Sequence, residues 1–164
     1  PLRSGFDEFF GIMSGAADHF SHKDMTAELD LFEGEVPVER TGYITDLLTQ
    51  KAVDYIKRPH AKPFYLSLHY TAPHWPWEGP KDVAVSDAMS YSPAGFRGGG
   101  SLKVYAEMMK SLDAGVGRVL AALKASGHEN DTLVIFTSDN GGYRFSFSWP
   151  FTGQTMDVTG GGVC

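Results

Sequence analysis

The sequence predicts an α/β fold in which a mixed, mostly parallel sheet is flanked by helices. Three features predict it: a short β-prone apolar run at 63–70, a long amphipathic pattern at 102–125, and a nearly continuous apolar run at 132–137. A strand, a helix and a second strand suit a layered α/β architecture, because each apolar face must be buried against another element. We expect the sheet to be incomplete within this chain.

The first third of the chain predicts irregular structure followed by a helix. Residues 1–40 show weak periodicity, with one hairpin expected to turn at Gly34. Thr45 and Asp46 then offer N-cap oxygens to a segment with helical apolar spacing. Pro59 ends that helix, since proline lacks the backbone N–H that the helix needs.

The middle of the chain alternates between regular elements and loops. The run at 63–70 predicts a buried strand, and the prolines of 71–77 prevent it from continuing as a paired strand. Residues 78–100 are rich in Gly, Pro and Ser, which predicts a long loop. The helix at 102–125 has apolar residues at steps of three and four, and Gly127 supplies its C-terminal stop.

Composition excludes several classes of function. The chain has 164 residues, of which 42% are hydrophobic and 21% charged, as in an ordinary globular domain. Its net charge of −6 and the absence of a basic cluster argue against nucleic-acid binding. No apolar run approaches the roughly 20 residues of a membrane span. Cys164 is the one cysteine, so cysteine usage does not indicate the compartment.

Asp139 and Asn140 are candidate metal ligands. They follow directly on the predicted strand at 132–137, and the carboxyl ends of strands are where α/β sheets bind ligands. A carboxylate and an amide carbonyl are hard oxygen donors suited to Ca²⁺ or Mg²⁺. The alternative is an Asx turn or a helix cap, which is common after a strand.

His74 is a candidate for proton transfer or anion binding. It lies between Pro73 and Pro76, directly after the predicted strand at 63–70, and the two prolines stiffen the loop around the imidazole. The alternative is a surface histidine in a proline-rich turn. Trp75 and Trp77 on the same loop suit stacking on a sugar or aromatic group, or equally a cover over the edge of the core.

The segment Asp18-His-Phe-Ser-His-Lys-Asp24 resembles a zinc site only superficially. His19 and His22 have chelating spacing, but no third or fourth ligand stands at a convincing distance in sequence. A polar loop or a cleft-lining segment is the favoured interpretation.

Five motifs, taken together, resemble the sulfatase family of the alkaline phosphatase superfamily. They occur in the order and spacing of that family and cover nearly the whole chain. They are Gly5-Phe-Asp-Glu-Phe-Phe-Gly11, Gly42-Tyr-Ile-Thr-Asp46, Pro63-Phe-Tyr-Leu-Ser-Leu with Ala72-Pro-His-Trp-Pro76, Tyr105-Ala-Glu-Met with Leu112-Asp-Ala-Gly-Val-Gly-Arg-Val-Leu120, and Asp131-Thr-Leu-Val-Ile-Phe-Thr-Ser-Asp-Asn-Gly-Gly142.

The resemblance implies an alkaline phosphatase-like α/β fold that hydrolyses sulfate esters with a bound Ca²⁺. Asp139 and Asn140 would then be two calcium ligands, and His74 would contact the sulfate near the leaving-group oxygen. A sulfate-ester small molecule or a sulfated glycan is the implied substrate. Relatives are mostly periplasmic, secreted or lysosomal, so the resemblance places the protein in one of these compartments. The oligomeric state is not predicted.

The sequence departs from the family pattern at the nucleophile. That family uses a formylglycine made from Cys or Ser in a Cys/Ser-x-Pro-x-Arg motif upstream of the Gly-Phe-Asp segment. The nearest match here, Ser148-Trp-Pro-Phe-Thr152, has Thr where Arg is required. The formylglycine and the remaining calcium ligands are therefore expected upstream of Pro1.

A second departure concerns a sulfate-binding lysine that relatives carry shortly after Trp-Pro. Thr155, or Gln154 beside it, stands at that position, and Gly160 stands where the relatives have a glutamate. Loss of a cation that pairs with sulfate would weaken charge stabilisation, because charge-assisted hydrogen bonds are the strong ones.

We therefore interpret residues 1–164 as part of a sulfatase catalytic domain that lacks its N-terminal nucleophile region and its C-terminal part. The full-length parent is expected to be a sulfuric ester hydrolase, and this segment alone is expected to be inactive. The alternatives are a phosphodiesterase or phosphonate hydrolase of the same superfamily, and a non-catalytic remnant or binding module.

Overall fold

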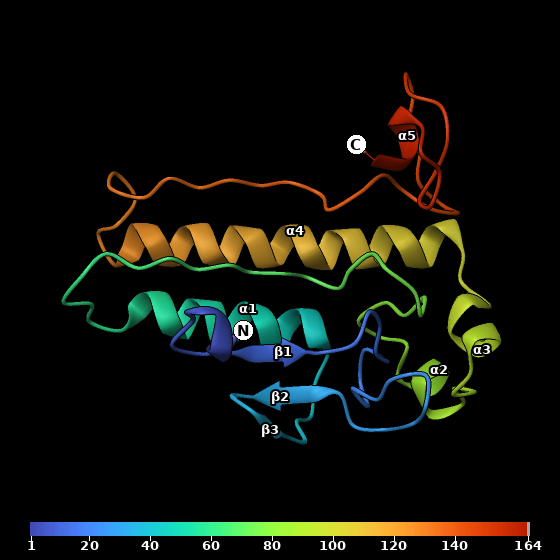
Figure 1. The fold of residues 1–164 in the computed structure, drawn as a ribbon, viewed down its shortest axis with the longest axis horizontal. Coiled ribbons are helices and arrows are strands. Elements are labelled where there is room, and N and C mark those ends of the chain that lie inside the picture. The colour runs from blue at the N-terminus through green and yellow to red at the C-terminus, as the bar shows by residue number, and fades with distance from the viewer. Residues whose placement is uncertain (164) are drawn as a thin grey trace. The chain divides into compact units, whose positions relative to one another are not determined.

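A computed structural model describes residues 1–163. The chain divides into two compact units, Pro1–Asn130 and the residues from Asp131 onward, and each is treated separately below (Figure 1). The first unit contains a small sheet and four helices of at least one full turn. The second unit is mostly irregular and carries the short helix α5 (Gly160–Val163).

A three-stranded antiparallel sheet opens the first unit after the short 3₁₀-helix η1 (Leu2–Ser4). Its strands lie in the order of the sequence, and they are β1 (Phe10–Ile12), β2 (Leu31–Glu33) and β3 (Val36–Pro37). Strands β2 and β3 form the predicted hairpin, in which Glu33 pairs with Val36. Gly34 makes the turn with a φ of 66°, a conformation that glycine adopts without steric cost.

Helices α1 (Ile44–Lys57) and α4 (Leu102–Ala125) lie side by side and run in the same direction (Figure 1). Both helices are confirmed, and α4 has the predicted bounds, with the Ser101 hydroxyl capping its N-terminus. The N-cap of α1 is Tyr43, whereas Thr45 and Asp46 lie in its first turn. Val53 and Ile56 of α1 pack against Ala122 and Leu123 of α4.

The segment at 63–70 runs along α1 and α4 as an extended chain (Figure 1). Alternate side chains pack on two apolar clusters formed by α1, α4 and β2: these side chains are Phe64, Leu66, Leu68 and Tyr70. Tyr65 and His69, which alternate with them, are exposed. The segment thus has the side-chain alternation of a strand, but among the described residues it has no ladder partner.

The predicted strand at 132–137 also has no ladder partner among the described residues. Leu133, Ile135 and Phe136 expose 85%, 77% and 73% of their surface, which is unusual for a run of this apolarity. The mostly parallel sheet expected from the sequence is therefore not found in residues 1–163, whose sheet is antiparallel. The physical reason is that extended segments become strands only where a neighbour supplies backbone hydrogen bonds.

The predicted loop at 78–100 contains two short helices, α2 (Val83–Asp87) and α3 (Pro93–Arg97). The hydroxyl of Ser92 caps α3 by accepting a hydrogen bond from the Gly95 N–H. Phe96 anchors α3, since its side chain is completely buried.

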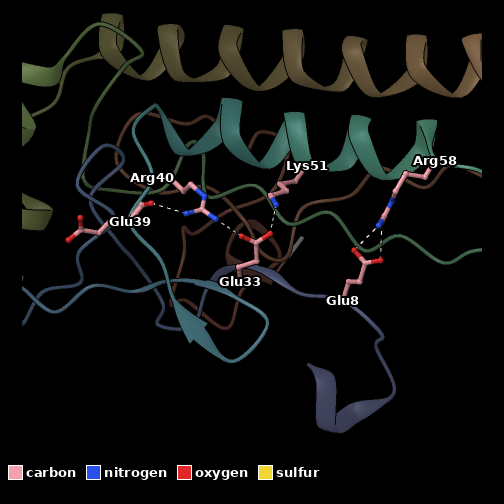
Figure 2. A network of polar contacts seen from close by, with 6 residues as sticks. All are labelled: Glu8, Glu33, Glu39, Arg40, Lys51 and Arg58. Carbon is pink, nitrogen blue, oxygen red and sulfur yellow. Dashed lines mark hydrogen bonds and ion pairs between the residues drawn. The ribbon is translucent and has the colours of Figure 1, made fainter.

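Exposed ion pairs connect the sheet side of the first unit to α1 (Figure 2). Glu33 of β2 accepts hydrogen bonds of 2.5 Å from both Arg40 and Lys51, and Arg58 at the end of α1 bonds Glu8 at 2.9 Å. All five side chains are substantially solvated, so these pairs contribute little to stability. No helix among residues 1–163 is long and apolar enough to cross a membrane.

Candidate functional site

A buried polar cluster lies in the first unit, where the turn at 18–22 contacts the loop at 71–80. Asp18, His19 and Glu78 are each 0% exposed, and His22 is 1% exposed. Four segments meet there: the turn at 18–22, the N-terminus of α1, the loop at 71–80 and helix α2. Ionisable side chains are rarely buried this completely without a partner, so the cluster requires a physical explanation.

Asp18 is stabilised as a carboxylate by three hydrogen bonds. Its Oδ1 accepts from the backbone N–H groups of Phe20 (2.9 Å) and Ser21 (2.7 Å) and from the hydroxyl of Ser86 in α2 (2.7 Å). Burial opposes ionisation, but the bonds from Ser21, Ser86 and Phe20 outweigh it and lower the pKa of Asp18. Its Oδ2 has no hydrogen-bond partner among the described residues.

Glu78 connects the loop at 71–80 to two other segments. Its Oε2 accepts a 2.9 Å hydrogen bond from the backbone N–H of His19, and its backbone carbonyl accepts one of 2.8 Å from the Tyr43 hydroxyl. Burial, and after it the negative charge of Asp18, raise the pKa of Glu78 to about 8, and the hydrogen bond from His19 opposes both effects. Oε1 has no partner among the described residues.

His19 is a fully buried neutral imidazole. Burial lowers its pKa to about 4, although the nearby charge of Asp18 acts in the opposite direction. Its ring stacks on that of Tyr43, with centroids 5.3 Å apart. Neither ring nitrogen has a hydrogen bond of normal geometry within residues 1–163. His74 is close enough for its charge to act on His19, so the cluster extends to the loop's exposed histidine.

The His22 side chain forms a hydrogen bond that connects the end of the turn at 18–22 to the segment before α1. Its Nε2 lies 3.1 Å from the backbone carbonyl of Gly42, which can only accept, so Nε2 carries the proton. Burial lowers the pKa of this imidazole. The His19 ring therefore packs on Tyr43 and the His22 ring bonds Gly42. Within residues 1–163 no group of three or more His, Cys, Asp or Glu side chains is arranged to hold a metal.

His74 is exposed and has a defined tautomer. Its Nδ1 lies 2.7 Å from the backbone carbonyl of Trp75, so Nδ1 must donate and Nε2 is the nitrogen left for a ligand. The imidazole contacts the Trp75 ring, with centroids 4.2 Å apart, and the guanidinium of Arg97 lies 5.3 Å from the centre of the same indole. Trp77, by contrast, is buried and contacts Tyr105 of α4, so it covers the core.

In the second unit, Thr155 meets Asn140. The Thr155 hydroxyl donates to Oδ1 of Asn140 at 3.2 Å and also bonds the carbonyl of Gly141, while its N–H donates to the carbonyl of Gly142 at 2.8 Å. Asp139 is exposed, and its Oδ1 accepts a 3.0 Å hydrogen bond from the Asn140 N–H. The structure thus brings together two of the residues that the sequence selected, at the turn that follows residues 132–137.

Asp139 and Asn140 offer the type of donor atom that a hard divalent cation binds, but they are too few to fill its coordination shell. A carboxylate and an amide oxygen are the donors that Ca²⁺ takes, and each retains lone pairs beyond the bonds described above. Two side chains fill only a minor part of the six to eight positions of a calcium shell. Among the described residues, no three His, Cys, Asp or Glu side chains are grouped so that they could hold a metal ion.

The buried role of Asp18, His19 and Glu78 was not predicted from the sequence. The sequence predicts a polar loop or cleft-lining segment for His19 and His22, with only a superficial likeness to a zinc site, and a long loop for Glu78. One signal was available for Glu78, since it follows Trp77 in an apolar, proline-rich context where an acid is unusual.

Comparison of the sequence with known proteins finds the sulfatase family, both as a family profile and as individual relatives. A profile of the sulfatase family matches residues 2–157. The uncharacterized sulfatase YdeN of Escherichia coli (strain K12) is 32% identical over 86% of this chain and 23% of its own length. N-acetylgalactosamine-6-sulfatase of Mus musculus is also 32% identical, over 86% of this chain and 27% of its own.

A solved structure gives the same result for the fold. The crystal structure of Ps i-CgsB in complex with k-i-k-neocarrahexaose is 29% identical, with a TM-score of 0.81 over 99% of this chain and 39% of that chain. The chain therefore spans well under half the length of these relatives. Because the family profile matches nearly every residue, the chain belongs to the sulfatase family.

Proposed function

We propose that the parent protein of this segment hydrolyses sulfate esters, and that residues 1–164 supply part of its active site. The observation that carries the proposal is the match of the sulfatase profile to residues 2–157, which includes the loop of His74 and the turn of Asp139. A non-catalytic binding module is the alternative for the segment alone, since it spans a minor part of its relatives.

His74 is proposed to act at the leaving-group oxygen. Cleavage of the sulfur–oxygen bond places negative charge on the departing alcohol oxygen, which needs a proton donor. The Trp75 carbonyl accepts the hydrogen bond from Nδ1, so the proton given to the leaving group comes from Nε2 of the imidazolium form, in which both ring nitrogens carry protons. Contact with the Trp75 ring restricts the imidazole further, which reduces the entropy lost when substrate binds.

Asp139 and Asn140 are proposed to supply two oxygen ligands for Ca²⁺, with the rest coming from outside this segment. A bound divalent cation would neutralise sulfate oxygens. Thr155 stands beside these ligands, and we propose that it lies at the edge of the sulfate pocket. Its hydroxyl there acts as a neutral donor toward Asn140.

A sulfated glycan is the proposed substrate class. N-acetylgalactosamine-6-sulfatase is named for a sulfated sugar, and the Ps i-CgsB structure is named for a complex with an oligosaccharide. The half-buried Trp75 beside His74 suits contact with a sugar ring.

The experiment is an assay of the full-length protein on aryl sulfates, sulfated oligosaccharides and aryl phosphodiesters, with and without added Ca²⁺. Sulfate-ester hydrolysis that depends on Ca²⁺ and is weakened in D139N would support the proposal. D131N, which removes an exposed carboxylate from the same unit, is the matched control. Hydrolysis of phosphodiesters with no sulfatase activity would replace the proposal with the phosphodiesterase alternative.

A further inference from the structure

Two buried carboxyl groups, Asp18 and Glu78, interact without a cation between them. Both are 0% exposed, and no described residue forms an ion pair with either. Asp18 Oδ2 and Glu78 Oε1 lack a hydrogen-bond donor within residues 1–163. Carboxylate oxygens only accept, so two ionised groups would repel each other and leave both oxygens unsatisfied. A single proton shared between Glu78 and Asp18 removes the charge repulsion and gives both oxygens a hydrogen bond.

The hydrogen bonds decide which residue holds that proton. Asp18 accepts three hydrogen bonds through Oδ1, two from backbone N–H groups and one from the hydroxyl of Ser86. Glu78 accepts one through its side chain, from the N–H of His19. Donors stabilise the charged form of a carboxyl group, so Asp18 is the carboxylate and Glu78 the acid.

The Glu78 side chain also connects the loop at 71–80 to the turn at 18–22 and, through that turn, to α1. It bonds the N–H of His19, and the carbonyl of His19 accepts a 2.9 Å hydrogen bond from the N–H of Ile44 at the start of α1. The Tyr43 hydroxyl bonds the Glu78 carbonyl. The loop at 71–80 is thereby fastened to α1 at a point four residues from His74.

We propose that Glu78 is a positioning residue for His74: its protonated Oε1 donates a hydrogen bond to Oδ2 of Asp18, and this bond holds the loop in the position from which His74 reaches the substrate. The inference rests on the proposed function of His74. When Glu78 loses its proton, two adjacent buried carboxylates repel, and the loop moves away from the turn at 18–22.

The other groups that face Glu78 do not replace it as the titrating group. Asp82, the N-cap residue of α2, adds negative charge and favours protonation of Glu78. Tyr43 stays neutral, because burial raises the pKa of its hydroxyl well above the usual value. Burial lowers the pKa of His19 to about 4, so this ring is uncharged at neutral pH. His22, held at Gly42, likewise has a pKa lowered by burial.

The first test is the pH dependence of kcat/KM for sulfate-ester hydrolysis by the full-length protein and its E78Q and E78A variants. In E78Q the side-chain amide N–H donates to Asp18 at every pH, and the amide oxygen still accepts from His19. We expect E78Q to retain activity within about threefold near neutral pH and to lose the decline above about pH 8. E78A should fall by about tenfold or more at every pH, since Asp18 Oδ2 is left without a donor.

D87N in α2 is the matched control, since it removes an exposed carboxylate near the cluster and should leave the alkaline decline unchanged. An E78Q profile that keeps the alkaline decline of the wild type would overturn the proposal. Retention of full activity by E78A would overturn it as well.

The second test does not require catalysis, so it stands even if the proposed sulfatase activity fails. Isotope-edited infrared spectra of the full-length protein should show a protonated carboxyl band at about pH 7 that is absent in E78Q. In D18N the band should disappear at a lower pH than in the wild type, because the charge of Asp18 is gone and the Asn amide can donate to an ionised Glu78, although burial still favours the acid. A wild-type spectrum without a protonated carboxyl at this pH would contradict the shared proton.

Discussion

The backbone amide of His19 donates a 2.9 Å hydrogen bond to Oε2 of Glu78, across 59 residues of sequence. This bond joins the turn at 18–22 to the loop that carries His74, and both partners are buried. The candidate site of the first unit therefore has an exposed histidine supported by a buried polar cluster.

The free energy of unfolding should fall with rising pH because of Glu78. Its pKa is about 8 in the folded protein and about 4.3 in an unfolded chain. Between these values the folded state holds a proton that the unfolded state has released, so stability decreases by up to about 1.4 kcal/mol per pH unit. E78Q should remove this slope. Urea unfolding at about pH 6.5 and 8 measures it, and equal slopes in wild type and E78Q would refute the assignment.

The titration of His19 should make the free energy of unfolding fall as the pH decreases, which is opposite to the effect of Glu78. Its pKa is about 4 when folded and about 6.5 when unfolded, so stability is lost as the pH falls between these values. In the wild type, the effects of Glu78 and His19 on the free energy of unfolding oppose each other from about pH 4.5 to 6.5. H19F keeps the contact with Tyr43 and removes the titration, so its stability should rise steadily as the pH falls through that range. H69Q, at an exposed histidine, serves as the control and should behave like the wild type.

Gly115 and Gly117 of α4 should respond oppositely to alanine. A Cβ at Gly115 would lie 2.6 Å from Oγ1 of Thr49 and 2.9 Å from the Tyr70 hydroxyl, whereas one at Gly117 would meet nothing within 4 Å. G117A should therefore stabilise the protein by about 0.5–1 kcal/mol through helix propensity. G115A should destabilise it by about 1–3 kcal/mol. Chemical denaturation compares them, and stabilisation by both variants would show that α1 and α4 are less closely packed there.

A lysine at position 155 should increase activity toward sulfate esters. Thr155 offers a neutral hydroxyl that is already used on Asn140 and Gly141, whereas a lysine would add a charged donor for sulfate. A hydrogen bond to a charged group contributes about 1.5–3 kcal/mol, so T155K in the full-length protein should raise kcat/KM by about tenfold to a hundredfold. T155V separates loss of the hydroxyl from gain of the cation. Equal rates for T155K and T155V would argue against a sulfate pocket at this position.

Local patterns were sufficient to predict the long helices α1 and α4 and the hairpin of β2 and β3, but not the short helices α2 and α3. The apolar spacing of α4 and Gly127 gave its bounds, and Gly34 gave the turn between β2 and β3. These elements depend on hydrogen bonds between neighbours in sequence, which is why single-sequence reasoning finds them.

The sheet and the buried cluster depend on distant partners and were not predictable in the same way. Residues 63–70 and 132–137 have strand-like composition, but ladder pairing needs a neighbour that their own sequence cannot specify. Likewise, the pKa of Glu78 is set by burial and by Asp18, which lies far away in the sequence. His74, Asp139 and Asn140 were selected because polar residues after apolar runs are local features.

The measurement that most directly tests the central claim is the leaving-group dependence of the H74A defect in the full-length protein. If Nε2 of His74 serves the departing oxygen, H74A should lower kcat/KM far more for an alkyl or sugar sulfate than for 4-nitrophenyl sulfate, whose phenolate leaves without a proton. We expect the two losses to differ by about a hundredfold or more. Equal losses on both substrates, or no loss on either, would contradict the assignment of His74 to the leaving group.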